Sequence, residues 1–132
     1  MTALYRKLAL HNRRQAGQNA DLRQSQAGIY YSSLAETGIV RGLASSGLPQ
    51  SHFPVRLPSA LRGRMCNYLR SRGIDTGTLF PFPAGLDARC YPRAASASRE
   101  VITLPLGPSL TSGEVRRIAE RVKDGLRMLA HG

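Results

Sequence analysis

Apolar residues recur at helical spacing most clearly near the end of the chain. Between residues 112 and 129 they fall three or four positions apart, at Val115, Ile118, Ala119, Val122, Leu126 and Leu129. Such a stripe predicts an amphipathic helix that packs on a sheet or on another helix. Thr111 and Glu114 stand at the spacing of a capping box, in which each side chain bonds to the backbone of the other residue. We therefore expect this helix to begin directly after Thr111.

The first part of the chain also has a helical pattern. Residues 3–36 contain no proline, and an apolar patch is formed at Ile29, Tyr30, Tyr31 and Leu34. Gly17 and Gly28 weaken a helix interior, so a break is plausible there. Residues 13–26 are so polar that the helix needs a partner surface or is only partly ordered.

Short alternating runs between these helices predict three strands, at residues 52–57, 74–82 and 100–104. Pro54 places the first strand at a sheet edge or a bulge, because proline has no N–H to donate. A second helix is expected to run from a cap at Ser59 to Arg72, with Gly73 placed to end it. A short helical or irregular stretch is expected at residues 94–98.

The predicted order is therefore helix, strand, helix, strand, strand, helix. It indicates an α/β (α+β) fold: a small three-stranded, mostly antiparallel sheet with helices packed on one face, preceded by a long N-terminal helix. A chain of 132 residues is long enough for one such core.

A formal net charge of +11 is the strongest compositional feature, and nearly all of the basic residues are arginine. Charge of this size attracts nucleic acid, anionic lipid or phosphorylated ligands. However, the arginines are scattered, with no run of five basic residues and no RNP-like aromatic motif. Solvated surface or an acidic partner explains them equally well, and nucleic-acid binding stays a third hypothesis.

Composition also bears on location. Cys66 and Cys90 complete no zinc set and are expected to be reduced thiols in a cytoplasmic protein, and no metal site is expected. No apolar stretch approaches the length of a membrane span. The first twenty residues lack acidic side chains, as transit peptides do, but they also fit the start of a helix.

Few residues carry the signature of catalysis. The histidines at 11, 52 and 131 have no nucleophile elbow nearby, and the glycines at 42 and 47 lack the lysine that a phosphate-binding loop requires. The only lysines are Lys7, within the first predicted helix, and Lys123, beside Asp124 on the last. Schiff-base chemistry needs a lysine in a partly desolvated pocket, and neither position fits that need.

Two passages resemble a known family. The first joins FPVRL at residues 53–57, the helix after it and SRGIDTG at residues 71–77. The second joins YPRA at 91–94, VITLPLGPSLT at 101–111 and EV at 114–115. Both are similar to the C-terminal small domain of the DegT/DnrJ/StrS aminotransferases, and the resemblance is firm over residues 52–128. RR at 13–14 and YYSSL at 30–34 are weakly similar to the interdomain helix of that family.

The resemblance implies a fold-type I protein, dependent on pyridoxal phosphate, that transfers an amino group, usually from glutamate, to a keto-sugar nucleotide. Such proteins are generally homodimers. Residues 1–51 would be the interdomain-type helix and loop, and residues 52–132 the small domain. The cofactor lysine, the aspartate beside the pyridine nitrogen and the phosphate cup would lie in a large domain outside this sequence. No catalytic or cofactor-binding residue is therefore assigned here.

One departure concerns the edge of the substrate pocket. Family members often carry a histidine after the second strand, where this sequence has FPFPAGL at residues 80–86. Phe80 and Phe82 are candidates for lining a substrate pocket there, although aromatic side chains near a strand end more often belong to a core.

Three functions remain as hypotheses. The first is a fragment or split subunit of a sugar-nucleotide aminotransferase-like protein, which caps an active site whose lysine lies in another chain or segment and is inactive alone. The second is a catalytically inactive remnant with a binding or scaffold role. The third is an arginine-rich nucleic-acid binder. The sequence identifies no sugar, amino donor or pathway.

Overall fold

The computed structural model describes residues 3–40, 51–78 and 81–130 of the chain. It confirms a mixed fold with a small antiparallel sheet and a long N-terminal helix. The elements in chain order are α1 (Ala3–Leu34), the 3-10 helix η1 (Ala35–Thr37), β1 (Phe53–Arg56), α2 (Ser59–Arg70), α3 (Pro92–Glu100), β2 (Val101–Leu104) and α4 (Ser112–Ala130).

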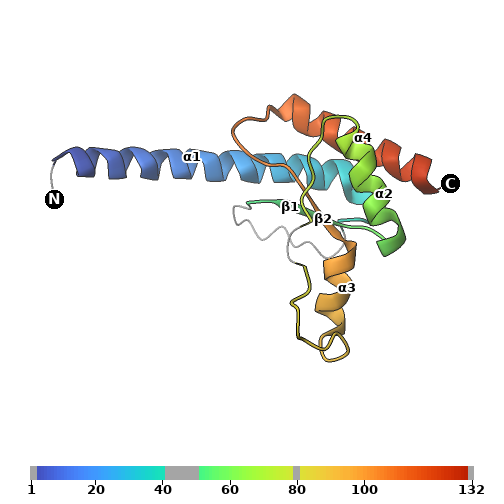
Figure 1. The fold of residues 1–132 in the computed structure, drawn as a ribbon. Helices are drawn as coiled ribbons and strands as arrows, with labels where there is room; N and C mark the ends of the chain where they lie inside the picture. The colour runs from blue at the N-terminus through green and yellow to red at the C-terminus, as the bar shows by residue number, and fades with distance from the viewer. Residues whose placement is uncertain (1–2, 41–50, 79–80, 131–132) are drawn as a thin grey trace.

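The helix α1 is continuous, so the predicted break at Gly17 or Gly28 is wrong. A side chain at either glycine would meet no atom within 4 Å, which places both on open helix surface. The N-terminal half of α1, residues 3–18, projects from the rest of the molecule (Figure 1). From Arg6 to Gln18 every residue is exposed, whereas the C-terminal half packs against the core.

Within the described residues the sheet contains two strands, whereas the sequence predicts three. β1 and β2 pair antiparallel, with Phe53 opposite Leu104. Residues 79 and 80 of the expected third strand, 74–82, lie outside the described residues. The described part of it joins β2 through one bridge, in which Gly77 and Thr103 exchange hydrogen bonds of 3.1 and 2.8 Å. Pro81 and Pro83 have no N–H, so they cannot extend this pairing into a ladder.

Pro54 occupies the kind of position that the sequence predicts, on an edge strand. It lies opposite Thr103, whose backbone N–H and C=O both bond to Gly77 on the far side of β2. The backbone of Pro54 therefore faces the outer edge of β1, where no donor to β2 is needed. On the same edge the N–H of Arg56 donates to the carbonyl oxygen of Ile39 at 2.8 Å.

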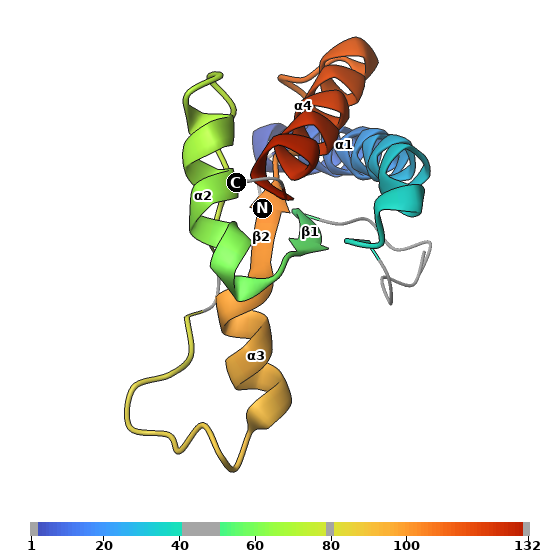
Figure 2. The ribbon, with the colours of Figure 1, turned by 90° about the vertical axis from the view of Figure 1, so that its right-hand side faces the viewer.

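The hydrophobic core lies between one face of the sheet and the helices. Phe53 and Val55 on β1 and their partners on β2 are buried on this face. The buried part of the α4 stripe is the one that the sequence predicts: Val115, Ile118, Ala119 and Val122. α3 and the loop before it extend away from α4, beyond the start of β2 (Figure 2).

The helices α2 and α4 approach each other closely at one point. A methyl group built on Gly125 of α4 would lie 2.8 Å from the sulfur of Met65 and 2.9 Å from the ring of Tyr68, both on α2. Real Cβ atoms do not approach other atoms so closely. Gly125 therefore permits the spacing of these two helices.

The predicted ends of the helices are partly right. Glu114 accepts hydrogen bonds from the N–H and the hydroxyl of Thr111 at 2.7 and 2.9 Å, and its own N–H donates to that hydroxyl, which confirms the capping box. Gly73 has a φ of 73° and ends the turn after α2, as expected. Ser59 does not cap α2, because Pro58 occupies the N-cap position and makes no side-chain bond.

The C-terminal half of α1 is fixed by polar contacts as well as by packing. The fully buried amide of Gln26 donates to the carbonyls of Gly107 and Leu110 and accepts from the N–H of Gly107, each at 2.9 Å. The hydroxyl of Tyr30 donates to the carbonyl of Pro105 at 3.0 Å, and its ring lies 5.1 Å from that of Phe53. Together these contacts bind α1 to the segment that joins β2 to α4.

Candidate functional site

The two phenylalanines proposed for a pocket edge have different outcomes. Phe80 lies outside the described residues. Phe82 is half-buried, in a loop of otherwise exposed residues that spans 81–91 and leads into α3. Neither a fully buried core role nor a fully exposed surface role fits Phe82, and its lining role stays a prediction.

Local polar contacts give this loop its shape. Asp87 accepts hydrogen bonds from the backbone and the guanidinium of Arg89, and their side chains form an ion pair of 2.9 Å. The hydrogen bonds from Arg89 hold the pKa of the Asp87 carboxyl below its usual value. α3 then begins with Pro92, which needs no N–H partner in the first turn of a helix. These contacts therefore give a defined shape to the loop that contains Phe82.

Neither lysine is placed to hold pyridoxal phosphate covalently. The ammonium of Lys123 lies 2.7 Å from a carboxylate oxygen of Glu120 and 3.9 Å from one of Glu36. These two ion pairs engage the Lys123 ammonium, whereas a Schiff-base lysine must reach into a pocket beside the cofactor. Lys7 is exposed on the N-terminal half of α1, beside a hollow of about 240 Å³ that it lines with Leu10, His11 and Arg14. The lysines of this chain therefore do not fit that cofactor.

Serine, histidine and aspartate meet at one hollow, but they do not form a catalytic triad. Ser51, His52 and Asp75 line a space of about 400 Å³ together with Arg23. Nδ1 of His52 lies 3.0 Å from the hydroxyl of its exposed neighbour Ser51. Among the described residues no hydrogen bond joins Asp75 to His52, so the imidazole lacks the orienting contact that a triad requires.

The cysteines and the other potential metal ligands are dispersed over the described part of the chain. Cys66 is buried and Cys90 exposed, and both are free thiols, as expected. Within residues 3–40, 51–78 and 81–130, no three His, Cys, Asp or Glu side chains gather so as to hold a metal ion. None of the helices described is both long and apolar enough to cross a bilayer.

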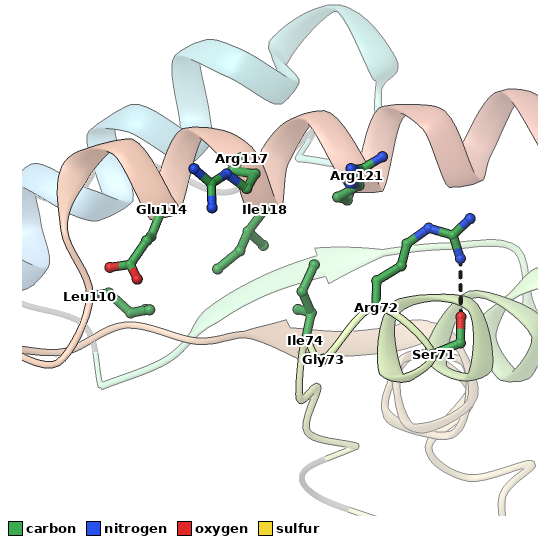
Figure 3. Close-up of a pocket in the computed structure, with 9 residues that line it drawn as sticks. All are labelled: Ser71, Arg72, Gly73, Ile74, Leu110, Glu114, Arg117, Ile118 and Arg121. Carbon is green, nitrogen blue, oxygen red and sulfur yellow. Dashed lines mark hydrogen bonds between the residues drawn. The ribbon is translucent and has the colours of Figure 1, made fainter.

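A larger groove lies between the end of α2 and the first turns of α4. It encloses about 670 Å³ and is lined by Ser71, Arg72, Gly73, Ile74, Leu110, Glu114, Arg117, Ile118 and Arg121. Arg117 and Arg121 come from α4 on one side, and Arg72 comes from the residues just after α2 on the other (Figure 3). We call this space the arginine groove.

The arginine groove is electrically unbalanced. Its lining carries three guanidinium groups and one carboxylate, that of Glu114. Hydrogen bonds from the backbone and the hydroxyl of Thr111, followed by the charge of Arg117, hold the pKa of Glu114 below its usual value, so the carboxylate stays ionised at neutral pH. Arg121 has a carboxylate partner outside the lining, Asp124, at 3.7 Å. No ion pair involves Arg72 or Arg117 among the described residues.

Sequence reasoning missed this groove. Glu114, Arg117 and Arg121 are three and four residues apart on a helix that the sequence predicts. This spacing was enough to place them on one face of that helix. What the sequence did not contain was the position of Arg72, which depends on how α2 and α4 cross. Gly125 permits the close spacing of the two helices where they cross.

Comparisons with known proteins agree on one family. The model of the DegT/DnrJ/EryC1/StrS aminotransferase family matches residues 1–123. The chain is 28% identical over 139 residues to dTDP-3-amino-3,4,6-trideoxy-alpha-D-glucose transaminase of Streptomyces venezuelae, covering 82% of this chain and 37% of that protein.

Solved structures of aminotransferases share the fold of this chain. The putative sugar aminotransferase Spr1654 of Streptococcus pneumoniae, in its PMP form, superposes with a TM-score of 0.76 at 21% identity, over 90% of this chain and 33% of its own. S. venezuelae DesV gives a TM-score of 0.62 at 29% identity, over 88% of this chain and 34% of its own. The chain thus spans about a third of the length of these relatives. It belongs to the DegT/DnrJ/EryC1/StrS aminotransferase family.

Proposed function

We propose that this chain is the small domain of a sugar-nucleotide aminotransferase-like protein and caps an active site whose cofactor lysine lies in another chain or segment. Residues 52–132 would form that domain and residues 1–51 the helix and loop that join it to a large domain. The chain would act as a C-terminal fragment or a split subunit in the cytoplasm, in a dimer with the active site at the interface. Pyridoxal phosphate, when bound there, would supply the electron sink for amino-group transfer.

The environment of the lysines is the observation that carries this proposal. Lys123 is held by two carboxylates, and Lys7 stands on an exposed helix surface. A family member needs an amine that can lose its proton beside the cofactor, and this chain offers none in such a position. The contribution left to its residues is to shape and close a site that another segment provides.

Two surfaces support a capping role. The N-terminal half of α1 projects with Leu8 and Leu10 exposed by 49% and 60%, which is suited to packing against a further domain. The loop of residues 81–91 projects with Phe82 half-buried, which is suited to bordering a substrate. Closure by such a loop would exclude water from the reacting groups.

The test of the lysines uses the purified chain with pyridoxal phosphate, followed by borohydride reduction and peptide mapping. We expect only weak, sub-stoichiometric labelling of the chain. The Lys123→Arg and Lys7→Arg variants should show the same labelling per remaining amine. A stoichiometric adduct that one of these substitutions abolishes, or transamination by the purified chain alone, would overturn the proposal.

The test of the capping role supplies a lysine-bearing large domain of the family in trans. We expect the mixture to form a complex and to gain transaminase activity that neither part shows alone. In this complex Phe82→Ala should raise the KM for the sugar substrate more than it lowers kcat. If the chain instead associates only with itself and confers no activity, the inactive scaffold becomes the better interpretation.

A further inference from the structure

The projecting half of α1, residues 3–18, carries a charge that the capping role does not explain. From Arg6 to Gln18 every residue is exposed, and the segment extends away from the core (Figure 1). It contains no acidic residue, since Asp21 is the first in the chain. Four of its side chains are fully charged cations: Arg6, Lys7, Arg13 and Arg14. Such a concentration of one sign of charge attracts an anionic partner.

These four charges gather on one side of the helix. Arg6 and Arg13 are seven residues apart, so they lie in one row with about 10 Å between them along the axis. Lys7 and Arg14 form a second row, which is rotated from the first by about 100° around the axis. Leu10 lies between the two rows. We call this side of the segment the basic face.

The side-chain positions agree with this helical geometry. The hollow of about 240 Å³ on this segment is lined by Lys7, Leu10, His11 and Arg14, so these side chains lie together. Leu10 is 60% exposed. Among the described residues no ion pair involves any of the four cations. The described part of the chain therefore leaves the charge of the basic face unneutralised.

The opposite side of the same segment is uncharged. It is formed by Leu8, Ala9, Asn12, Gln15 and Ala16. Leu8 and Leu10 are two residues apart and so point to opposite sides of the helix. The segment therefore has no continuous apolar face of the kind with which a helix binds in a membrane surface. The uncharged side stays available for packing against a large domain while the basic face remains outside that contact.

The composition of the basic face favours nucleic acid over an acidic protein. Leu10 is its one large apolar residue, whereas the buried centre of a protein–protein interface is largely apolar and depleted of charge. Interfaces with DNA are more polar and much more positively charged. Three of the four cations are arginine, which binds phosphoryl oxygens with two parallel hydrogen bonds. Residues 6–18 include no aromatic side chain to stack on unpaired bases, which favours a duplex over a single strand.

We propose that the basic face binds duplex DNA, with the projecting half of α1 lying in the major groove. An α-helix with its side chains is about 10–12 Å across, and this groove is about 12 Å wide. One row of cations faces the phosphates of one strand and the other row those of the second strand, with Leu10 toward the bases. The major groove of duplex RNA is deep and narrow and does not admit the helix. The proposal is independent of the capping role, because it requires neither a large domain nor pyridoxal phosphate.

The test is fluorescence anisotropy of a labelled DNA duplex titrated with the whole chain. We expect a Kd below about 100 μM at about 0.1 M salt. The Kd should rise by about 3.6 logarithmic units for each tenfold rise in salt, because four phosphates are neutralised. Arg13→Gln combined with Arg14→Gln should weaken binding more than about tenfold and lower this slope by about 2. Absence of binding, or a slope that the paired substitution leaves unchanged, would overturn the proposal.

Two controls separate the position of the charges from their total number. Arg93→Gln combined with Arg99→Gln removes the same charge from exposed positions on α3, which lies away from the projecting half (Figure 1). It should change the Kd less than about threefold, because salt screens distant charges. Arg14→Gln combined with Gln15→Arg keeps the net charge but moves one cation to the uncharged side, and it should weaken binding as much as Arg14→Gln alone. Equal weakening by the α3 pair, or full recovery in the transfer variant, would overturn the proposal because total charge would then govern binding.

Competing anions test the choice of partner. Duplex RNA of the same sequence should bind at least about fivefold more weakly than duplex DNA, and equal binding would overturn docking in the major groove. Stronger binding of an oligoglutamate peptide of the same total charge would overturn the proposal in favour of an acidic protein. Circular dichroism of each variant checks that α1 remains helical, which is expected because glutamine favours a helix nearly as well as arginine.

Discussion

The two halves of α1 are continuous in backbone but opposite in what holds them. The N-terminal half is exposed from Arg6 to Gln18 and projects beyond the core, whereas the C-terminal half buries Gln26, Tyr30 and Leu34 completely. An exposed helix of this length is marginal without a partner, because nucleation is costly and each residue adds little. The comparison teaches that one helical pattern can contain a segment held by tertiary contacts and another that depends on intrinsic propensity.

The largest difference in stability between the two halves of α1 should appear when an apolar side chain is removed from each. Leu34→Ala empties a fully buried position and should lower the free energy of unfolding by about 3 kcal/mol. Leu10→Ala, at a position 60% exposed, should change it by less than about 0.5 kcal/mol. Urea unfolding of both variants measures the difference. Equal costs would mean that the projecting half is buried in solution.

Removing a polar contact of the buried half of α1 should also lower the free energy of unfolding, by a smaller amount. Gln26→Leu leaves the N–H of Gly107 and two nearby carbonyls without their partner, at a cost of about 2 kcal/mol. Gln24→Leu makes the same substitution at an exposed position of the same helix and serves as the control. If the two variants unfold at the same urea concentration, the bonds of Gln26 do not fix α1.

A pair of adjacent tyrosines refines this test to one hydroxyl. Tyr30→Phe keeps the ring beside Phe53 but removes the bond to the carbonyl of Pro105, which should cost about 1 kcal/mol. Burial raises the pKa of the Tyr30 phenol above its ordinary value, so the hydroxyl remains a donor at neutral pH. Tyr31→Phe, 41% exposed, should be silent in the same unfolding measurement.

The two glycines of α1 should distinguish global from local stability. Gly28→Ala should raise the free energy of unfolding by about 0.7 kcal/mol, because alanine favours the helix and its methyl group meets no neighbour. Gly17→Ala should leave that value unchanged but slow amide hydrogen exchange in the projecting half. A global gain from Gly17→Ala would show that both halves unfold as one unit.

The smallest effect is the pH dependence of stability that comes from the capping box at the start of α4. The folded pKa of Glu114 is lowered from 4.5, chiefly by hydrogen bonds from Thr111, so the unfolded chain binds the proton more tightly. The stabilisation is therefore complete above about pH 4.5 and is lost as the pH falls through the lower folded pKa. Thermal melts should show a smaller loss between pH 6 and pH 3 for Glu114→Gln than for the unaltered chain. An identical loss would contradict this role.

What the sequence could predict followed from local rules. The capping box at Thr111, the stripe of α4 and the edge position of Pro54 each depend on residues close together in the chain, and all three are confirmed. The third strand was wrong in the part that the structure describes, because periodicity at residues 74–82 does not reveal that Gly77 alone among those described residues pairs with β2. The break in α1 was wrong at Gly28, where glycine propensity was considered without the distant carbonyls that bind Gln26, and at Gly17, where the helix continues without such contacts. The arginine groove was missed for the same reason, since its walls meet only in the folded chain.

The lack of free donors at the outer edge of β1 affects how this chain can pair with other molecules. Pro54 has no N–H there, and the N–H of Arg56 is already bonded to Ile39. An incoming strand from another molecule would find no free donor at either position, so this edge resists the strand addition from which aggregates grow. The described pair of strands thus carries its own protection against intermolecular pairing on that side.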